Sequence, residues 1–468
     1  MHNILLITIE SLRSDRIHSF GYPGDITPNI DKLVNSGTSF NNAFATSTWT
    51  PASITSILTS NYSLSFKGCI SPLETTTSIA QVLRNAGFRT GAFNSGAWLS
   101  SPYYARGFEK YHYGTKKPFL KIYDKFLNIS EKFGLENQMD AIYRRYKRAR
   151  SHFDRYFLEY QYSKNLNKLA LSWVKYILSK NNNFFLWIHY PDTHEPYFIT
   201  RRRAQELGLS FREILELNEK AMYKMGTRKK NDLSLTNKEK SLLSSLYDEC
   251  ILDVDEQIGF HLDVLKKFNV LDDTYVIVTS DHAQQFFEHG EFGHDLYVYD
   301  EVVNVPLIFS GPGITFSKHS HMVSLLDLAP TIFDLIGIPN PRFRSIGQNL
   351  LREKRKFIFI EDSRRKRNDF KIIDGKVFVD TRWLTIGCRT NRWKYIYNAN
   401  GKDELYDLLK DPHERQNIVD TKNQIAEQLK LLVIQHLREK EKRHRTMYKI
   451  NLLRGKSSFL ARKGDNLI

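Results

Sequence analysis

The sequence predicts an α/β fold with a mostly parallel central sheet, helices on both faces of that sheet, and a small C-terminal antiparallel sheet. Two observations lead to this fold class. Apolar runs typical of buried strands alternate with helical stretches through the first part of the chain, which favours a parallel sheet. After Pro339-Asn340-Pro341 the pattern changes to short strands, which is typical of a small antiparallel sheet.

The predicted central strands are nearly continuous apolar runs, as expected where both faces of a strand are buried. Residues 4–9 form such a run. The run lacks a basic leader and a small-residue cleavage site, so it indicates a first strand rather than a signal peptide. Later strands of this sheet are expected at residues 90–93, 184–188, 274–279 and 306–309.

The predicted helices carry start and stop signals. Pro28 lies in the first turn of a helix that begins near residue 27, and Gly87 follows a helix over residues 77–86. A long helix is expected over residues 246–268, and another over 326–335.

These patterns divide the chain into a large N-terminal domain over residues 1–340, an α+β subdomain over 341–435 and a basic tail over 436–468. A basic, aromatic-rich helical insertion is expected at about 115–180, and its densest patch is at 143–150. Interleaved arginines and aromatics can contact nucleic acid, a glycan or an anionic membrane. A solvated basic helix face explains the same composition, and we favour that interpretation.

Composition limits the partners and the location. A net charge of +16 favours an anionic ligand such as a phosphorylated or sulfated glycan, although a solvated basic surface gives the same charge. No apolar run approaches the ~20 residues that span a bilayer, so we expect no transmembrane segment, with peripheral membrane contact left open. The scattered cysteines (Cys69, Cys250 and Cys388) predict no disulfide framework, and a cytoplasmic location is the default.

Charged side chains follow two of the predicted strands. Glu10 comes directly after the first strand, and Asp281-His282 follow the strand over residues 274–279. Ligands of open α/β sheets bind beyond the carboxyl ends of the strands, so we expect these side chains to meet. Two carboxylates and an imidazole suit Zn²⁺ or Mn²⁺. Taken alone, Glu10 would be more typical of a polar loop residue.

Thr50 lies where a helix is predicted to begin, because Pro51 suits the first helical position. Thr50 is therefore expected to be the N-cap of a helix over residues 52–59. Free backbone N–H groups at a helix start favour phosphate or sulfate. A hydroxyl beside a metal can attack phosphorus or sulfur, whereas a purely structural cap is the alternative role.

Histidines follow two of the predicted strands, at residues 184–188 and 274–279. His194 lies within residues 189–197, just past one strand, and His289 and His294 lie in the loop after His282. Such histidines can bind the oxygens of an ester or protonate its leaving group, or they can be structural. Their expected convergence at one sheet edge favours a site.

The order of these motifs resembles that of the sulfatases. Residues 3–16 resemble the opening strand and first metal motif of that family, and residues 50–60 are similar to its nucleophile motif. Residues 191–197 resemble its substrate-binding histidine loop, and residues 279–282 its second metal motif. The resemblance runs from about residue 3 to about 420 and implies the alkaline phosphatase/sulfatase superfamily and its fold, with residues 1–340 as the catalytic domain.

The departures from the sulfatase pattern are informative. Thr50 stands where sulfatases carry the cysteine or serine that is oxidised to formylglycine, so that group cannot form. Ala52 and Ile54 replace the proline and arginine of the same motif. Glu10 replaces an aspartate, and His282 stands where many sulfatases carry asparagine.

The resulting set resembles the phosphoethanolamine transferases and lipoteichoic acid synthases, which use a threonine nucleophile and a divalent metal such as Zn²⁺ or Mn²⁺. His294 lies twelve residues after His282, similar to a substrate histidine of the phosphoethanolamine transferases. The resemblance implies one divalent metal, with Zn²⁺ or Mn²⁺ preferred over Ca²⁺ or Mg²⁺. Its implied ligands are Glu10, Thr50, Asp281 and His282.

The resemblance implies a metal-dependent hydrolase or phosphotransferase that acts on a phosphate ester through a covalent intermediate on Thr50. His194 and His294 would be catalytic. Arg13, Asp192 and His289 would bind the anionic substrate, a glycan or a glycolipid; nucleic acid is not an expected partner. Arg13 is equally compatible with a structural role.

Two other functions remain open. One is a sulfatase-like hydrolase of sulfate esters that works without formylglycine. The other is a non-catalytic protein on a degenerate enzyme fold that binds an anionic glycan. Absence of the motif arginine favours the second alternative, whereas Glu10, Asp281 and His282 argue against it.

Overall fold

The computed structural model of this chain describes residues 2–63, 76–94, 99–113, 160–227, 235–294, 297–338, 346–362, 370–373 and 376–440. The predicted insertion lies outside the described residues up to residue 159, and the predicted tail lies outside them from residue 441. Cys69 is also outside them, whereas Cys250 and Cys388 are buried free thiols. Among the described residues, none of the helices combines the length and apolar character that a bilayer span requires.

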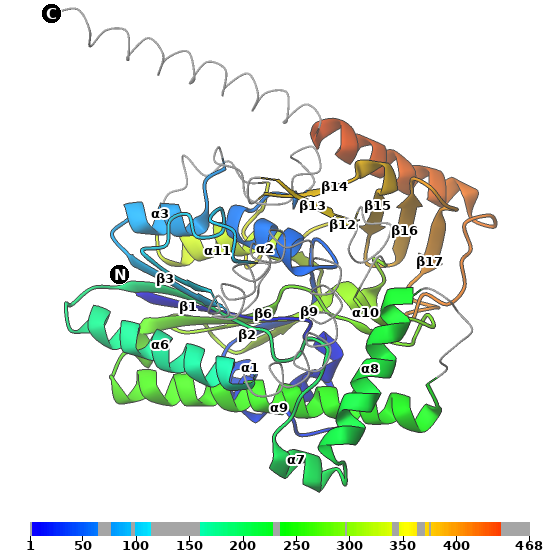
Figure 1. The fold of residues 1–468 in the computed structure, drawn as a ribbon. Helices are drawn as coiled ribbons and strands as arrows, with labels where there is room; N and C mark the ends of the chain where they lie inside the picture. The colour runs from blue at the N-terminus through cyan, green and yellow to red at the C-terminus, as the bar shows by residue number, and fades with distance from the viewer. Residues whose placement is uncertain are drawn as a thin grey trace, which may run out of the picture.

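A nine-stranded sheet forms the centre of the molecule (Figure 1). All neighbouring strands in it are parallel except at β9, which runs antiparallel to both of its neighbours, β2 and β6. In hydrogen-bonded order the strands are β10 (Ser317–His319), β2 (Thr38–Phe44), β9 (Asn304–Ser310), β6 (Thr274–Ser280), β1 (Asn3–Ile9), β5 (Phe184–Tyr190), β3 (Arg89–Asn94) and β4 (Lys110–Tyr113), and β11 (Val323–Ser324) also pairs with β2.

Helices cover both faces of this sheet (Figure 1). One face carries α2 (Thr50–Thr59), α3 (Ile79–Asn85) and α11 (Leu328–Leu335); the other carries α1 (Pro28–Ser36), α6 (Tyr160–Leu178) and α9 (Asn237–Lys267). The remaining elements of this part are α7 (Arg201–Glu206), α8 (Phe211–Thr227), α10 (Asp300–Val303), the hairpin β7 (Gln285–Phe286) and β8 (Phe292–Gly293), and the 3₁₀ helices η1 (Ser14–Arg16), η2 (His18–Phe20), η6 (Leu271–Asp273) and η7 (Leu325–Asp327).

Alternation along β1 builds two hydrophobic cores. Ile4 and Leu6 join the core that contains α2, α3 and α11, whereas Leu5 and Ile7 join the core that contains α1, α6 and α9. Successive side chains of a strand point to opposite faces, so an unbroken apolar run is needed where both faces are covered. The predicted fold class is confirmed, including the apolar first strand.

The three central strands end at the same level. In the sheet register, Ile9 of β1 lies beside Tyr190 of β5 and Ser280 of β6. Since all three strands run in the same direction, the residues that follow them emerge at one edge of the sheet.

A four-stranded antiparallel sheet forms the C-terminal part, as the short strands predict. Its order is β12 (Ile358–Asp362), β15 (Thr385–Arg389), β16 (Trp393–Asn398) and β17 (Glu404–Asp407). A C-terminal helix over residues 423–440 packs its Leu429 and Val433 against this sheet. The hairpin β13 (Phe370–Ile373) and β14 (Lys376–Val379) and the 3₁₀ helix η8 (Thr381–Trp383) lie between β12 and β15 in the chain. The domain boundary near residue 340 stays a prediction.

One helix is longer than the sequence pattern predicts. The helix expected to begin at residue 246 begins at Asn237 as α9. Thr236 and Glu239 form a capping box at this start, in which each side chain accepts a backbone N–H of the other residue. This local polar signal lies ahead of the apolar periodicity, which begins only further along the helix.

A buried ion cluster joins the C-terminal sheet to the central domain. Lys394 of β16 is fully buried, and its Nζ lies 2.8 Å from Asp300 Oδ1 and 2.9 Å from Glu414 Oε1. Arg389 of β15 also pairs with Asp300, at 2.8 Å. Asp300 is the first residue of α10, so these ion pairs cross between the two sheets.

We expect Lys394→Met to lower the free energy of unfolding by about 3–5 kcal/mol, because it leaves two buried carboxylates without their shared cation. Lys402, which pairs with Asp420 at the surface, provides the matched control. Lys402→Met should cost no more than about 1 kcal/mol. Urea unfolding of both variants measures the difference, and equal small losses would contradict a stabilising role for the buried cluster.

Candidate active site

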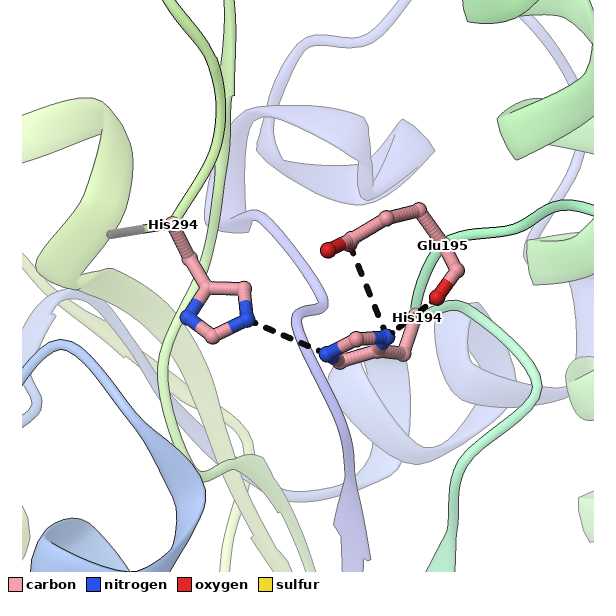
Figure 2. A group of neighbouring side chains, drawn as sticks. All are labelled: His194, Glu195 and His294. Carbon is pink, nitrogen blue, oxygen red and sulfur yellow. Dashed lines mark hydrogen bonds and ion pairs between the residues drawn. The ribbon is translucent and has the colours of Figure 1, made fainter. Parts of the chain in front are cut away.

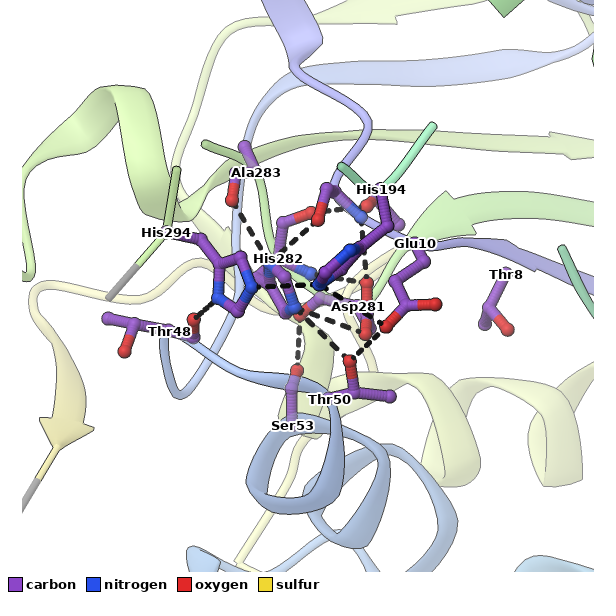
Figure 3. A network of polar contacts seen from close by, with 12 residues as sticks. Thr8, Glu10, Thr48, Thr50, Ser53, His194, Asp281, His282, Ala283 and His294 are labelled. Carbon is purple, nitrogen blue, oxygen red and sulfur yellow. Dashed lines mark hydrogen bonds and ion pairs between the residues drawn. The ribbon is translucent and has the colours of Figure 1, made fainter. Parts of the chain in front are cut away.

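The residues predicted to form the site converge at the carboxyl edge of the central sheet (Figure 3). The Thr50 hydroxyl donates to Glu10 Oε1 at 2.9 Å and lies 3.3 Å from His282 Nε2. Thr50 is 3% exposed and Glu10 5%, and Asp281 and His282 are fully buried. The four side chains therefore share one small, nearly dry space, although Thr50 is 232 residues from His282 in the chain.

The predicted N-cap role of Thr50 is wrong by one position. Thr50 is the first residue of α2, and Trp49, in an extended conformation, is the N-cap. Pro51 then occupies the second helical position rather than the first, which a proline also tolerates because neither position needs its N–H in the helix. The Thr50 hydroxyl is consequently directed to Glu10 and His282 instead of capping its own helix.

Backbone N–H groups hold one oxygen of Asp281. The N–H groups of Ser11 and His282 donate to Asp281 Oδ1 at 3.2 and 2.9 Å. Ser11 adopts φ 63°, a left-handed conformation that is costly for a residue with a side chain, and this turn aims its N–H at the carboxylate. The other oxygen, Oδ2, has no hydrogen-bond partner in the part of the chain that the structure describes, and it lies 3.4 Å from His282 Nε2.

The hydrogen bonds of His282 define its tautomer. Nδ1 lies 3.0 Å from the carbonyl oxygen of Ala283, which can only accept, so Nδ1 carries the proton. The second ring nitrogen, Nε2, is the one that could bind a cation. This atom faces the Thr50 hydroxyl and the open oxygen of Asp281 (Figure 3).

His189 opens the predicted histidine segment 189–197, but the sequence did not predict it as a metal ligand. It is fully buried within β5, its Nε2 has no hydrogen-bond partner among the described residues, and this atom lies 3.7 Å from Glu10 Oε2. The ligand atoms of Glu10, His189 and Asp281 all lie within 4.8 Å of one another. The available signal was an imidazole inside a strand that is otherwise apolar, but the predicted strand ended one residue earlier, at Ile188.

These donors fit a divalent cation. Two carboxylates with one or two imidazoles are typical of Zn²⁺ or Mn²⁺ sites, and two of the ligand atoms here lack any other partner. Burial by itself raises the pKa of Glu10, but His194 and His189 outweigh that effect and lower it to about 2. Glu10 is thus ionised at neutral pH and available to a cation.

His194 and His294 form a pair beside this cluster (Figure 2). Their Nε2 atoms are 3.0 Å apart, and their Nδ1 atoms contact the carbonyl oxygens of Glu195 and Thr48 at 2.6 and 2.8 Å. Carbonyls only accept, so each Nδ1 carries a proton, and the contact between the Nε2 atoms needs one more. A proton shared between the two Nε2 atoms would give the pair one positive charge, and the ligand atoms of His194, Glu195 and His294 also lie within 4.8 Å of one another, as a bound cation would require. His194 Nε2 also lies 4.0 Å from Glu10 Oε1.

Two protein-family models match the chain. The model described as Sulfatase matches residues 2–338, and the model described as N-sulphoglucosamine sulphohydrolase, C-terminal, matches residues 287–443. The chain belongs to the sulfatase family. The predicted membership of the wider superfamily is confirmed by this match, and the closer resemblance to the phosphoethanolamine transferases stays a prediction.

Individual sulfatases are similar to this chain over different lengths. Arylsulfatase K of Canis lupus familiaris is 32% identical over 187 residues, which cover 39% of this chain and 35% of that relative. The uncharacterized sulfatase YidJ of Escherichia coli strain K12 is 22% identical over 443 residues, or 89% of this chain and 83% of that relative. The chain thus spans about a third of the length of the arylsulfatase K that it matches.

A solved structure extends the similarity in fold. The phosphonate monoester hydrolase of Agrobacterium radiobacter superposes with a TM-score of 0.68 at 19% identity and covers 95% of this chain and 96% of that one. At an identity this low, the superposition shows a shared fold alone.

The three residues predicted to bind substrate are placed differently from the central set. Arg13 is saturated by protein partners: its guanidinium pairs with Asp15 at 2.7 Å and Glu288 at 2.5 Å, and donates to the Gln284 carbonyl at 3.0 Å. Asp192 is half-buried in the loop after β5. A substrate-binding role for these residues stays a prediction.

His289 makes protein contacts away from Thr50. Its Nδ1 lies 2.5 Å from Glu301 Oε1, its Nε2 lies 2.9 Å from the Glu414 carbonyl, and its ring stacks on Tyr299 at 3.8 Å. Burial lowers the pKa of His289, but the bond to Glu301 and the other acceptors outweigh it and raise the pKa to about 9. His289 is therefore protonated at neutral pH and ties the site loop to the C-terminal part.

Stability should accordingly depend on this histidine. The pKa of His289 is raised on folding. Its contribution to the free energy of unfolding is therefore complete below its ordinary pKa of 6.5 and is lost as the pH rises through about 9. We expect the melting temperature of the wild type to fall over this window, and His289→Gln to show a smaller fall. His18→Gln, at an exposed position, is the control. Identical pH profiles for wild type and His289→Gln would contradict this role.

Metal content tests the ligand set. We expect purified wild type, dialysed against Zn²⁺ or Mn²⁺, to retain the ion, and Asp281→Ala to lose it. His189→Ala should weaken the affinity by about tenfold or more, as for other groups that hold a bound metal in place. His18→Ala should have no effect. Unchanged affinity in His189→Ala would exclude that imidazole from the ligands.

Proposed function

We propose that this sulfatase-family member cleaves an anionic ester, preferably of phosphoric or phosphonic acid, with Thr50 as the nucleophile. The observation that carries the proposal is the buried Thr50 hydroxyl, 2.9 Å from Glu10 Oε1 and 3.3 Å from Nε2 of His282. A threonine hydroxyl shielded from water and surrounded by groups that accept its proton is suited to nucleophilic attack.

Glu10, Asp281 and His282 would hold one divalent cation, with His189 as a further imidazole. Zn²⁺ or Mn²⁺ suits these donors better than Ca²⁺ or Mg²⁺, because imidazole nitrogen is a softer ligand than oxygen. A bound divalent cation supplies positive charge that stabilises the ionised form of the Thr50 hydroxyl and the negative charge of the ester.

The start of α2 adds donors for the anion. The first hydrogen bond of this helix runs from the Ser53 N–H to the Trp49 carbonyl, so the N–H groups of Thr50 and Ala52 precede the helical pattern. Such N–H groups at a helix start, together with the helix dipole, stabilise phosphate or sulfate oxygens. They therefore favour negative charge at the atom that Thr50 would attack.

The His194–His294 pair supplies the proton for the leaving group. The shared proton between the two Nε2 atoms can move to the ester oxygen when its bond breaks, and the pair then becomes neutral. Its positive charge also attracts the anionic ester beforehand. Water, or a hydroxyl group in the case of a transferase, then displaces Thr50 and regenerates the site.

Thr50 determines how a covalent intermediate would be resolved. Formylglycine cannot form from threonine, so a covalent intermediate here must be resolved by attack at the phosphorus or sulfur atom itself. A sulfate ester is the second candidate substrate, because the matching family models describe sulfatases and an N-sulphoglucosamine sulphohydrolase. The net charge of +16 suits either ester on an anionic glycan or glycolipid.

A metal-supplemented screen of phosphate monoesters, phosphate diesters, phosphonate monoesters and sulfate esters separates these candidates. Turnover of phosphoric or phosphonic esters alone would support the main proposal. Release of sulfate with indifference to phosphorus esters would support the second candidate. Absence of turnover with every class and every metal would favour a non-catalytic binding protein.

Thr50→Ala should abolish turnover, by about 10³-fold or more, while the metal stays bound through the remaining ligands. Thr50→Ser should retain a measurable rate, because it keeps the hydroxyl. Ser56→Ala, whose hydroxyl donates to the Ala52 carbonyl within α2, is the matched control for disturbance of the helix. A Thr50→Ala variant with the wild-type kcat would exclude Thr50 as the nucleophile.

A further inference from the structure

A cavity of about 260 Å³ lies apart from the residues of the active site, between the C-terminal helix, the start of β12 and the end of α2. Tyr62, Phe357 and Phe359 form an aromatic lining. The ring of His436 completes this lining, stacked on Phe359 at 4.0 Å and edge-on to Tyr62 at 4.7 Å. The cavity therefore has flat apolar walls that suit a ring or a short hydrocarbon.

Two cationic side chains line the same cavity. Lys440, at the end of the C-terminal helix, is 8% exposed and donates through Nζ to Glu361 Oε1. Arg355 donates to Asp327 through Nε, at 2.7 Å, and through Nη2. Each cation thus has one carboxylate partner, and neither carboxylate is part of the cavity lining.

Several donors in this lining are unused within the part of the chain that the structure describes. Arg355 Nη1 makes no hydrogen bond there, and Lys440 uses one of its N–H groups. The Tyr62 hydroxyl accepts the Phe359 N–H at 3.3 Å, and its own proton has no acceptor. These donors are available to an acceptor that enters the cavity and carries several oxygens.

The two cations lie among three carboxylates, of which only Glu439 is among the described lining residues of the cavity. Burial lowers the pKa of Lys440, although Glu361 acts in the opposite direction. A second negative group beside Lys440 would stabilise its charged form. Glu439, the acidic residue of the lining, is exposed at the surface and accepts from Gln435 at 3.1 Å. The interior of the cavity thus presents donors, and its carboxylate lies toward solvent.

We propose that this cavity binds a small oxyanion carried on an aromatic or short apolar body, such as an aromatic carboxylate. The oxyanion would accept from Arg355 and Lys440 and from the Tyr62 hydroxyl, and the body would pack between Phe357 and Phe359. The volume is suited to a ligand smaller than a typical drug-sized molecule. This binding site shares no residue with the proposed catalytic set and does not depend on the proposed function.

Titration calorimetry on the full-length chain, with benzoate and inorganic sulfate as separate probes, tests the proposal. We expect saturable benzoate binding by the wild type, weakened about tenfold by Tyr62→Phe, which removes the hydroxyl donor, or by Arg355→Lys, which removes the planar guanidinium fork. Phe357→Ala should weaken benzoate and leave sulfate nearly unchanged. Arg438→Met, an exposed cation on the same helix, should leave both probes unaffected.

The two mild variants keep the test informative if Lys440→Met fails to fold. Arg355→Lys retains a cation for Asp327, and Tyr62→Phe retains the ring; circular dichroism checks the fold of each. Thr50→Ala should bind benzoate as the wild type does. Benzoate binding that survives both cavity variants but is lost in Asp281→Ala would place the probe in the active site and overturn the proposal. Absence of benzoate binding by the wild type would overturn it equally.

Discussion

The site depends on the burial of two carboxylates, Glu10 and Asp281, at the carboxyl edge of the central sheet. Carboxylates removed from water are costly unless N–H groups or cations offset their charge. Two backbone N–H groups satisfy one oxygen of Asp281, and histidines surround Glu10. Among the described residues, Asp281 Oδ2 and His189 Nε2 still have no hydrogen bond. A divalent cation bound between them would add the positive charge that the carboxylates lack. The Thr50 hydroxyl lies beside this position, so its reactivity is linked to the same electrostatic requirement.

The C-terminal sheet supports the segment before Thr50 through backbone contacts. The N–H of Glu361 in β12 donates to the Thr46 carbonyl at 2.9 Å, and its carbonyl accepts the Ser47 hydroxyl at 2.6 Å. These contacts fix the segment that leads into α2, and the Thr48 carbonyl of that segment orients His294. Thr50 and the histidine pair are thus positioned by contacts between the C-terminal sheet and the central domain. The buried ion cluster around Lys394 stabilises the same junction.

Much of the site could be predicted because it obeys a rule about strand ends. Apolar runs located β1 and β6, and parallel strands in register bring Glu10 and Asp281 to one edge. The exact helix start at Thr50 was wrong by one residue, since the extended backbone of Trp49 depends on tertiary contacts. His189 lay inside a strand and gave no pattern of its own. The partners of His289 are equally invisible in the sequence, because Glu414 is 125 residues away.

A covalent group on Thr50 is the most direct consequence of this arrangement. The decisive measurement is peptide mass spectrometry of protein that is acid-quenched during turnover of an ester found to be a substrate. The account predicts a phosphoryl or sulfo group on the peptide that contains Thr50, present only while substrate lasts. Rapid turnover with that peptide unmodified at every quench time, and with the group found on another side chain, would contradict it.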